Sequence, residues 1–432
     1  MGDLVLADAD AFFTYTPDWL DSGLPGFCLL GDGAIWGPDT VAYPVSERIP
    51  VFPRLLALIP GNNPRNLQRR HYLDLLRARL GREPPPGIDT EWQLLTLGGH
   101  GGIGHVDVFA DDLGAEDWYR AIDAEHAAVP PGEARSELWR MLKREVLDEN
   151  VSFDPQVVEE ILGPTPSVGG MIPKLLVAID PTAAQPRFYP PGTPGHTDVV
   201  LKVEPPEYVG LLDLEALCLD LHAEAGFATP AHHRFDADGL HFLAVERFDR
   251  DDNGPLPVES LFSVIATGDH DFRETGDILL DELGEVFTRL REVATLAPDT
   301  EEQFYRRLLM ALLTGNGDLH LDNVALLGGL DDCRLTPVYD PSPMRAWPRH
   351  NLVSAIPFDP EGYPDHGAYF VALGKHFGLD KQQTGQCIDD ALAATADYPE
   401  RVMAHERVPL TQRQQLADIG RAERELLEKH RP

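Results

Sequence analysis

The chain has 432 residues and a strongly acidic balance, with 71 Asp and Glu against 36 Lys and Arg and a formal net charge of −35. A field of this sign repels the phosphate backbone of nucleic acids, so we expect no direct nucleic acid partner. The basic segment at residues 64–82 is interpreted as the solvated face of a helix. The composition, with 43% apolar residues, 38 Gly and 38 Pro, is typical of a globular chain with many loops and excludes a disordered or fibrous protein.

The cysteines and the apolar runs bear on the compartment. The four cysteines lie far apart and none forms a CxxC pair, which argues against a disulfide framework and against a thiolate zinc site. No apolar run approaches the roughly 18 to 20 residues of a membrane span. The first residues carry acids where a signal peptide has a basic region. We therefore expect a cytoplasmic protein with no membrane partner.

The first third of the chain predicts a small mixed module followed by helices. Residues 1–110 combine short apolar runs with turn dipeptides, which indicates an α+β module. Its last part is a glycine-dense loop at 98–104, which is expected to lead into a strand at 106–109. Residues 115–163 carry apolar positions three and four apart and are predicted to be helical.

A different pattern begins at residue 165. A turn rich in Ser and Gly leads into an apolar strand, and a Pro-rich loop separates that strand from a second one at 198–203. A helix at 211–227 follows, and then two more short strands within 231–248. After a polar connection at 249–257, most of the remainder is predicted to be helical. A small strand-rich lobe joined to a larger helical lobe is the architecture that encloses a nucleotide in kinases.

Lys202 and Glu215 give the first chemical indication. Lys202 is the only basic residue of the buried-looking strand at 198–203, and Glu215 follows 13 residues later on the predicted helix. A Lys in an apolar strand is unfavourable by several kcal/mol unless it meets an anion, and phosphates with a helix carboxylate would supply one. The alternative is a Lys that extends into solvent from the end of the strand.

A polar loop and a later aspartate give the second and third indications. Asp318 and Asn323, five residues apart, supply a carboxylate for an acceptor hydroxyl and a neutral oxygen ligand for a divalent metal, which phosphoryl transfer needs. Asp340 comes 17 residues after Asn323, where kinases place the aspartate that binds magnesium. Each pattern alone also fits an ordinary polar turn. Their common order and spacing favour the kinase interpretation.

With these residues in view, the sequence resembles the HipA-type serine/threonine kinases, the toxin components of bacterial toxin and antitoxin modules. The resemblance implies an α+β, two-lobed protein-kinase-like fold with an N-terminal α+β subdomain at 1–112, an N-lobe with a glycine-rich turn at 113–250 and a mostly helical C-lobe at 251–432. The matching segments run in family order over nearly the whole chain: FTYTPDWL at 13–20, GGHGGIGHVDVF at 98–109, SVGG at 167–170 followed by Lys174, LKV at 201–203, AVERFDR at 244–250, NGDLHLDN at 316–323 and LTPVYD at 335–340.

The resemblance implies an ATP site between the lobes. Ser167, Gly169 and Gly170 match the family's turn above the phosphates, and Ser167 is the candidate for autophosphorylation. Lys202 would hold the phosphates and pair with Glu215. The segment between the lobes, which meets adenine in the family, would contribute Glu246 and Phe248.

The resemblance also places catalysis and metal binding in the C-lobe loops. Asp318 would be the catalytic carboxylate, and His320 would support its loop or touch phosphate. Asn323 and Asp340 would bind Mg²⁺, with Tyr339 as a neighbour of the site.

The sequence departs from the family pattern at several of these positions. Ile172 and Pro173 interrupt the glycine turn, where the family has a Gln before its Lys. Asp322 replaces a Lys that is common beside the family's Asn. Its negative charge is expected to raise the carboxylate pKa values of Asp318 and Asp340, or to demand an extra cation.

The leading hypothesis is an ATP- and Mg²⁺-dependent protein serine/threonine kinase that transfers the γ-phosphoryl group to a protein hydroxyl. The family implies a helix-turn-helix antitoxin as a partner and a substrate such as a translation factor or an aminoacyl-tRNA synthetase. Two alternatives stay open. One is a small-molecule phosphotransferase, since the acidic excess suits a cationic substrate; the other is a catalytically inactive kinase-fold binding module.

Overall fold

The structure is a computed structural model, and it describes most of the chain. The described ranges are 1–29, 40–62, 66–128, 174–182, 188–189, 191–237, 240–251 and 253–432. Five positions singled out in the sequence lie outside the described residues, namely Ser167, Gly169, Gly170, Ile172 and Pro173. The predicted helical region at 115–163 is described only as far as residue 128.

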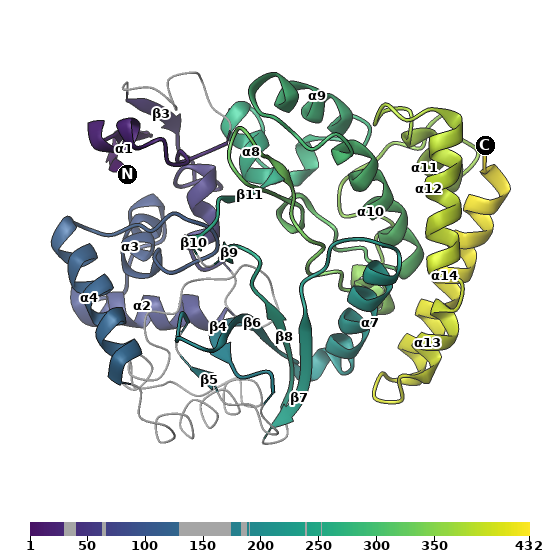
Figure 1. Cartoon of the computed structure of the whole chain (residues 1–432), viewed down its shortest axis with the longest axis horizontal. Helices are drawn as coiled ribbons and strands as arrows, with labels where there is room; N and C mark the ends of the chain where they lie inside the picture. The colour runs from purple at the N-terminus through teal and green to yellow at the C-terminus, as the bar shows by residue number, and fades with distance from the viewer. Residues whose placement is uncertain are drawn as a thin grey trace.

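The N-terminal part of the chain forms an antiparallel sheet with helices beside it, drawn in purple and blue in Figure 1. The strands β1 (Gly2–Ala7), β2 (Asp10–Tyr15) and β3 (Val41–Pro44) pair in the order β1-β2-β3. Alternate residues of β2 are buried, because successive side chains of a strand point to opposite faces. The helical segments of this part are α1 (Pro17–Ser22), η2 (Pro53–Leu58), α2 (Leu67–Leu80), α3 (Ile88–Gly98) and α4 (Asp112–Ala128).

The predicted strand at 106–109 is wrong, because this segment is a loop. The Asp107 carboxylate accepts a hydrogen bond from the Gly101 backbone N–H at 2.6 Å, and the Val108 N–H donates to the Gly99 carbonyl at 2.8 Å. These bonds fasten the segment to its own glycine loop. A strand would instead have needed a neighbouring strand to take up its backbone groups.

The interpretation of the basic segment as a fully solvated helix face is wrong at Arg69. This side chain of α2 is buried and donates to the Glu91 carboxylate of α3 and to the Pro60 carbonyl. Arg77 and Arg79 are exposed, as the interpretation requires. Arg69 is therefore a structural contact between two helices.

The middle of the chain forms an antiparallel sheet whose strands differ in length, drawn in teal in Figure 1. Its strands pair in the order β5-β4-β6-β8-β7. The predicted succession of strand, strand, helix, strand and strand is confirmed, with the two-residue β5 in addition. The elements are β4 (Lys174–Ile179), β5 (Phe188–Tyr189), β6 (Thr197–Val203), η3 (Pro206–Tyr208), α7 (Leu211–Glu224), β7 (His232–Ala237) and β8 (Leu240–Glu246).

Each face of this sheet has its own apolar cluster. Helix α7 packs Leu212, Ala216 and Leu219 against Leu243 and Val245 of β8. The alternate residues of β8 belong to the cluster on the opposite face, together with side chains of β4 and β6. In the sheet, β6 lies between β4 and β8. A side chain that points from β6 toward α7 is therefore buried between these two strands and the helix. This arrangement fixes the surroundings of Lys202.

The remainder of the chain is largely helical, with the C-terminal helices in yellow at one edge of the molecule (Figure 1). The polar connection at 249–257 contains a short hairpin. Among the described residues, no helix is both long and apolar enough to cross a membrane. The strands are β9 (Arg250–Asp251), β10 (Gly254–Pro255), β11 (Val258–Ser260), β12 (Ala325–Leu327) and β13 (Arg334–Leu335). The helices are α8 (Leu261–Gly268), η4 (Thr275–Asp277), α9 (Leu283–Val293), α10 (Thr300–Thr314), η5 (Leu321–Asn323), η6 (Met344–Ala346), η7 (Pro348–His350), α11 (His366–Leu373), α12 (Lys381–Ala394), α13 (Tyr398–Ala404) and α14 (Leu410–His430).

Candidate active site

Lys202 of β6 and Glu215 of α7 form a buried ion pair. The Lys202 ammonium donates to Glu215 Oε1, and the side chains are 4% and 0% exposed. Burial on this scale requires that each charge find a partner, since water is excluded from both. The contact brings together the two residues that the sequence placed 13 positions apart, and Lys202 does not extend into solvent.

Asp340 joins this pair from the C-terminal part of the chain. Its Oδ1 lies 2.6 Å from the Lys202 ammonium, and its Oδ2 lies 2.7 Å from the ammonium of Lys174, the first residue of β4. Ser342 Oγ donates toward Asp340 Oδ1 and Glu215 Oε2, at 3.1 Å from each. The result is a closed network of two ammonium groups, two carboxylates and a hydroxyl.

Asp340 also has an unusual backbone conformation. Its φ is 52°, which is left-handed and uncommon for a residue with a side chain. Conformations of this kind cost on the order of 1 to 3 kcal/mol and concentrate at functional sites, where the surrounding contacts hold them. The ion pairs of its carboxylate with two lysines are contacts of that kind.

Sequence reasoning did not assign a role to Lys174 or Ser342. Lys174 appeared only as the residue that ends the glycine-turn pattern, and Ser342 stands two residues after Asp340 in a proline-rich stretch. The available signal for Lys174 was a charge at the start of a strand of apolar residues. Ser342 carried no signal, because a Ser between two prolines is typical of any turn.

The network sets the pKa values of its members. Burial alone would lower the pKa of Lys202, but Asp340 and Glu215 outweigh burial and raise it. Burial alone would raise the pKa of Asp340, but Lys174 and Lys202 hold it well below the usual range. The expectation of a raised pKa at Asp340 is therefore wrong, because two ammonium groups contact its carboxylate directly.

Asp318 lies in a loop that begins where α10 ends. Gly315 terminates the helix with φ 73°, and a Cβ at this position would come within 2.6 Å of the Leu416 side chain. The Asp318 N–H donates to Asn316 Oδ1 at 3.0 Å, and Asn323 Nδ2 donates to the Asp318 carbonyl at 2.9 Å. These bonds fold the loop back on itself and hold the Asp318 backbone in place.

The Asp318 carboxyl has a raised pKa. Burial is the main cause, and the nearby Asp340 carboxylate raises it further, while His320 and Lys174 oppose the shift. The direction agrees with the expectation for Asp318, but the neighbouring charge that contributes is Asp340. A carboxyl with a raised pKa is closer to the operating range of a general base than an ordinary aspartate.

Asp322 and His320 shape the rest of the loop. His320 Nδ1 accepts from the Asp322 N–H at 3.2 Å, so His320 supports the start of η5. The Asp322 carboxylate accepts from Ser260 Oγ at 3.2 Å, and its carbonyl accepts from Tyr339 OH at 2.8 Å. Asp322 is thus tied to β11 and to the residue before Asp340.

The candidate adenine residues lie beside this loop and at the end of β8. The Phe248 ring centroid is 5.6 Å from that of Tyr339, so Phe248 packs against the residue that precedes Asp340. Glu246 Oε1 lies 2.9 Å from His233 Nε2 on the neighbouring strand β7. Glu246 therefore has a protein partner within the sheet, and its assignment to adenine stays a prediction.

Comparison with known proteins identifies the family of the chain. Residues 166–398 match the family described as HipA-like C-terminal domain. The chain belongs to this family. The resemblance to HipA-type kinases that the sequence motifs indicated is thereby confirmed.

This HipA-like protein also matches individual proteins. It is 26% identical over 217 residues to "Putative kinase Y4dM" of Sinorhizobium fredii (strain NBRC 101917 / NGR234). The aligned residues cover 47% of each chain, so this chain spans about half the length of the curated relative it matches. A chain of the Shewanella oneidensis MR-1 toxin antitoxin system, a complex of HipA, HipB and operator DNA, superposes with a TM-score of 0.60 and 17% identity, over 99% of this chain and 95% of that one. The Helicobacter pylori proinflammatory kinase CtkA gives a TM-score of 0.43 and 10% identity, over 61% and 90%. The Shewanella match confirms the predicted α+β, two-lobed kinase-like fold.

The residues of this HipA-like site fit a magnesium ion that is shared with phosphates. Among the described residues, no group of three or more His, Cys, Asp or Glu side chains could hold a metal alone. Mg²⁺ in phosphoryl-transfer sites needs only one or two protein oxygens, because phosphates and waters complete its shell. Asp340 supplies a carboxylate, and the Nδ2 bond of Asn323 to the loop leaves its amide oxygen as the group suited to a metal.

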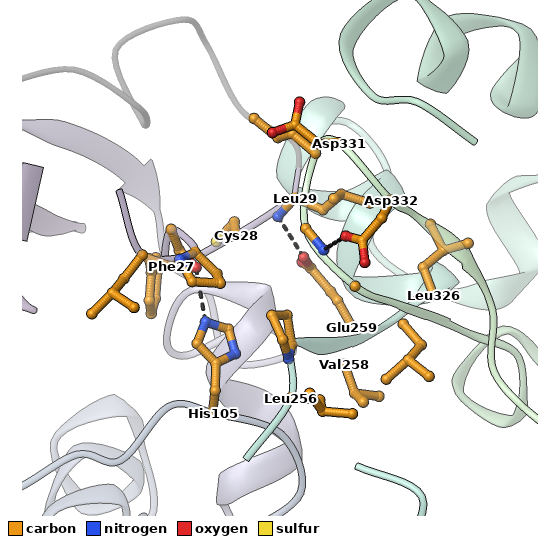
Figure 2. A pocket seen from close by; sticks show the side chains of 18 of the residues that line it. Phe27, Cys28, Leu29, His105, Leu256, Val258, Glu259, Leu326, Asp331 and Asp332 are labelled. Atoms are coloured by element: carbon orange, nitrogen blue, oxygen red, sulfur yellow. Dashed lines mark hydrogen bonds between the residues drawn. The ribbon is translucent and has the colours of Figure 1, made fainter. Parts of the chain in front are cut away.

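A separate cavity of about 430 Å³ lies between the N-terminal part and the helical part of this HipA-like protein (Figure 2). Glu259 of β11 and Leu29 both line the cavity, and Glu259 Oε2 accepts a hydrogen bond from the Leu29 N–H at 2.7 Å. None of the candidate site residues lines this cavity, so it is distinct from the Lys202 network. Its described lining residues are 23–29, Arg54, His105, 256–259, 326–332 and Arg334.

Proposed function

We propose that this HipA-like protein is an ATP- and Mg²⁺-dependent protein serine/threonine kinase. The observation that carries the proposal is the convergence of Lys202, Glu215 and Asp340 in one buried network. Kinases use a Lys and Glu pair and a metal-binding Asp in this way to hold a nucleotide. The folded-back loop that carries Asp318 and Asn323 supports the same assignment.

The residues of the site divide the work of phosphoryl transfer. Lys202 would hold ATP phosphates while Glu215 keeps its ammonium in position. Asp340 and the Asn323 amide oxygen would bind Mg²⁺, which when bound neutralises charge on the phosphate oxygens. Asp318 would orient the acceptor hydroxyl and take its proton as the hydroxyl oxygen bonds to the γ-phosphorus and the bond from that phosphorus to the leaving ADP breaks. The glycine turn with Ser167, Gly169 and Gly170 would cover the phosphates.

A DNA-binding antitoxin is the partner that we propose. The Shewanella neighbour is described in a complex with HipB and operator DNA. With a formal net charge of −35, this chain would approach DNA mainly through such a partner. We propose a protein as the phosphoryl acceptor, with a translation factor or an aminoacyl-tRNA synthetase as the first candidates, and Ser167 as an autophosphorylation site.

The test is the intact mass of the purified chain after incubation with ATP and Mg²⁺, beside the Asp318→Asn variant. One added phosphate on the wild type alone, mapped to a Ser or Thr peptide, is the expected result. Phosphate that appears only on added amino alcohols or amino sugars would replace the protein kinase with a small-molecule phosphotransferase. Absence of both transfer and ATP binding would leave a kinase-fold binding module.

A further inference from the structure

We propose that Lys174 is an exchangeable cation, which occupies the metal side of Asp340 until a nucleotide brings Mg²⁺ and offers the lysine phosphates in return. The proposal deepens the function proposed above and rests on it. It concerns a residue that neither the sequence patterns nor the comparisons assigned. Its consequence is that the free protein protects Asp340 from metal and binds metal and nucleotide together.

The geometry begins with two lysines that face each other across neighbouring strands. Lys174 of β4 and Lys202 of β6 are direct partners in the antiparallel register. Like charges directly opposite each other on paired strands repel. Here both side chains are almost fully buried, at 8% and 4% exposed, so solvent screens the repulsion only weakly. An anion between them is needed, and Asp340 fills that place with one oxygen for each ammonium.

The two lysines are not held equally. Lys202 has a second carboxylate partner, Glu215, whose side chain is fully buried and also accepts from Ser342 Oγ. For Lys174, the only carboxylate at ion-pair distance among the described residues is Asp340. Losing Asp340 Oδ2 would therefore leave Lys174 with no carboxylate at ion-pair distance among the described residues, whereas Lys202 would keep Glu215. The cation that can leave is Lys174.

Each carboxylate oxygen of Asp340 already contacts the ammonium group of a lysine. A divalent ion that approaches Oδ2 must displace the Lys174 ammonium, and that ammonium then needs another anion because it is buried. Nucleotide phosphates would supply that anion. Metal and nucleotide should consequently bind with positive coupling, and the metal alone should bind weakly. Asp340 and Lys174 together make the site specific for a metal that arrives with phosphate.

The experiment uses Mn²⁺ as the metal probe, because it shares the oxygen ligands of Mg²⁺ and its binding can be followed by electron paramagnetic resonance. Mn²⁺ is titrated into the full chain without nucleotide, for wild type, Lys174→Met, Lys174→Met with Asp340→Asn, and Lys375→Met. The last variant is the matched control, since Lys375 is an exposed lysine and its loss changes the net charge equally. ADP is titrated separately by calorimetry, with and without Mn²⁺.

We expect Lys174→Met to bind Mn²⁺ about tenfold or more tightly than wild type, because a cation adjacent to the carboxylate has been removed. The gain should vanish in the double variant and be absent in Lys375→Met. The enhancement of ADP affinity by Mn²⁺ should be smaller in Lys174→Met than in wild type. Thermal unfolding and circular dichroism of each variant identify any that fails to fold, and Lys174→Gln then replaces Lys174→Met in the same titrations.

Equal Mn²⁺ affinity of the wild type and a folded Lys174 variant, measured without nucleotide, would overturn the proposal. This outcome is separate from a failure of the proposed kinase function, because no phosphoryl transfer is measured. A chain that binds no ADP would count against the kinase function while its Mn²⁺ titrations still decide the role of Lys174.

Discussion

Arg345 and Glu423 form a buried ion pair between the segment that follows Asp340 and the C-terminal helix α14, with Arg345 Nη1 and Glu423 Oε1 2.8 Å apart. Glu423 also contacts His366 of α11 through its other oxygen, at 2.5 Å. The carboxylate thus connects two helices to the stretch of chain that follows Asp340. The ion pair of Arg345 in this stretch depends on a residue 78 positions later in the sequence.

We expect Glu423→Ala to be strongly destabilising. The change leaves the buried Arg345 guanidinium without its carboxylate, and such losses typically cost about 3 to 5 kcal/mol. The free energy of unfolding from urea titration measures the effect. Glu428→Ala, on the exposed face of the same helix, is the control and should change stability by less than about 0.5 kcal/mol. Equal effects of the two changes would mean that the ion pair contributes nothing.

The contact between His366 and Glu423 predicts a pH-dependent stability. The hydrogen bond to Glu423 raises the pKa of His366 above its ordinary value. The stabilisation by protonated His366 is therefore complete below the unfolded-state pKa of about 6.5 and is lost as the pH rises through the raised folded-state pKa. Between about pH 5.5 and pH 8.5 the urea midpoint of wild type should fall by more than that of His366→Gln. Parallel pH profiles would contradict this assignment.

We expect Lys202→Met to abolish nucleotide binding and to destabilise the fold. Glu215 is fully buried, and without the ammonium its charge has lost the partner that lies closest to it. Removal of one member of a buried ion pair costs about 3 to 5 kcal/mol. Urea unfolding and ADP titration report the two effects, and Lys202→Met with Glu215→Leu should recover stability without recovering ADP binding. A double variant as unstable as the single one would argue against an uncompensated Glu215.

Asp318→Asn is expected to lower the rate of phosphoryl transfer by roughly a hundredfold to ten-thousandfold, the usual contribution of a general base. The fold should be unaffected, because backbone groups of Asp318 hold the loop together. Burial and Asp340 raise the pKa of Asp318, so activity should be lost on acidification at a higher pH than an ordinary aspartate would give. Rates of autophosphorylation across pH measure both effects. An acidic limb in the ordinary range would show that Asp318 is not the titrating base.

Asp322 offers a test of the main departure from the family pattern. Its carboxylate accepts from Ser260 and its side chain is 57% exposed, so Asp322→Lys should alter stability by less than about 1 kcal/mol. A cation in this loop should strengthen ADP binding severalfold through its attraction to phosphate. Calorimetry with ADP measures the change, and Asp331→Lys, at an exposed position outside the loop that carries Asp318, controls for net charge. If both changes act equally, only the overall charge matters.

Local patterns in the sequence predicted most of the elements around the candidate site and the residues proposed for its chemistry. Apolar patterns located the strands beside Lys202 and the helix that carries Glu215, because burial of one face leaves a repeating pattern in the chain. The order and spacing of Lys202, Asp318 and Asp340 pointed to phosphoryl transfer, since few other tasks require those groups together. The alternation of apolar and polar residues at 106–109 predicted a strand that does not form. Hydrogen bonds between side chains and the backbone can hold such a segment in place without a neighbouring strand.

The way the charges combine depends on contacts between segments far apart in the chain. The register of β4 against β6 sets Lys174 opposite Lys202, and the left-handed backbone at Asp340 accompanies a carboxylate that bridges both. Neither follows from local sequence, because strand register and backbone strain are fixed by packing between segments far apart in the chain. A pKa depends on the nearest charges in space. The sequence pattern led us to expect that Asp322 would raise the pKa of Asp340, but the contacts with Lys174 and Lys202 lower it.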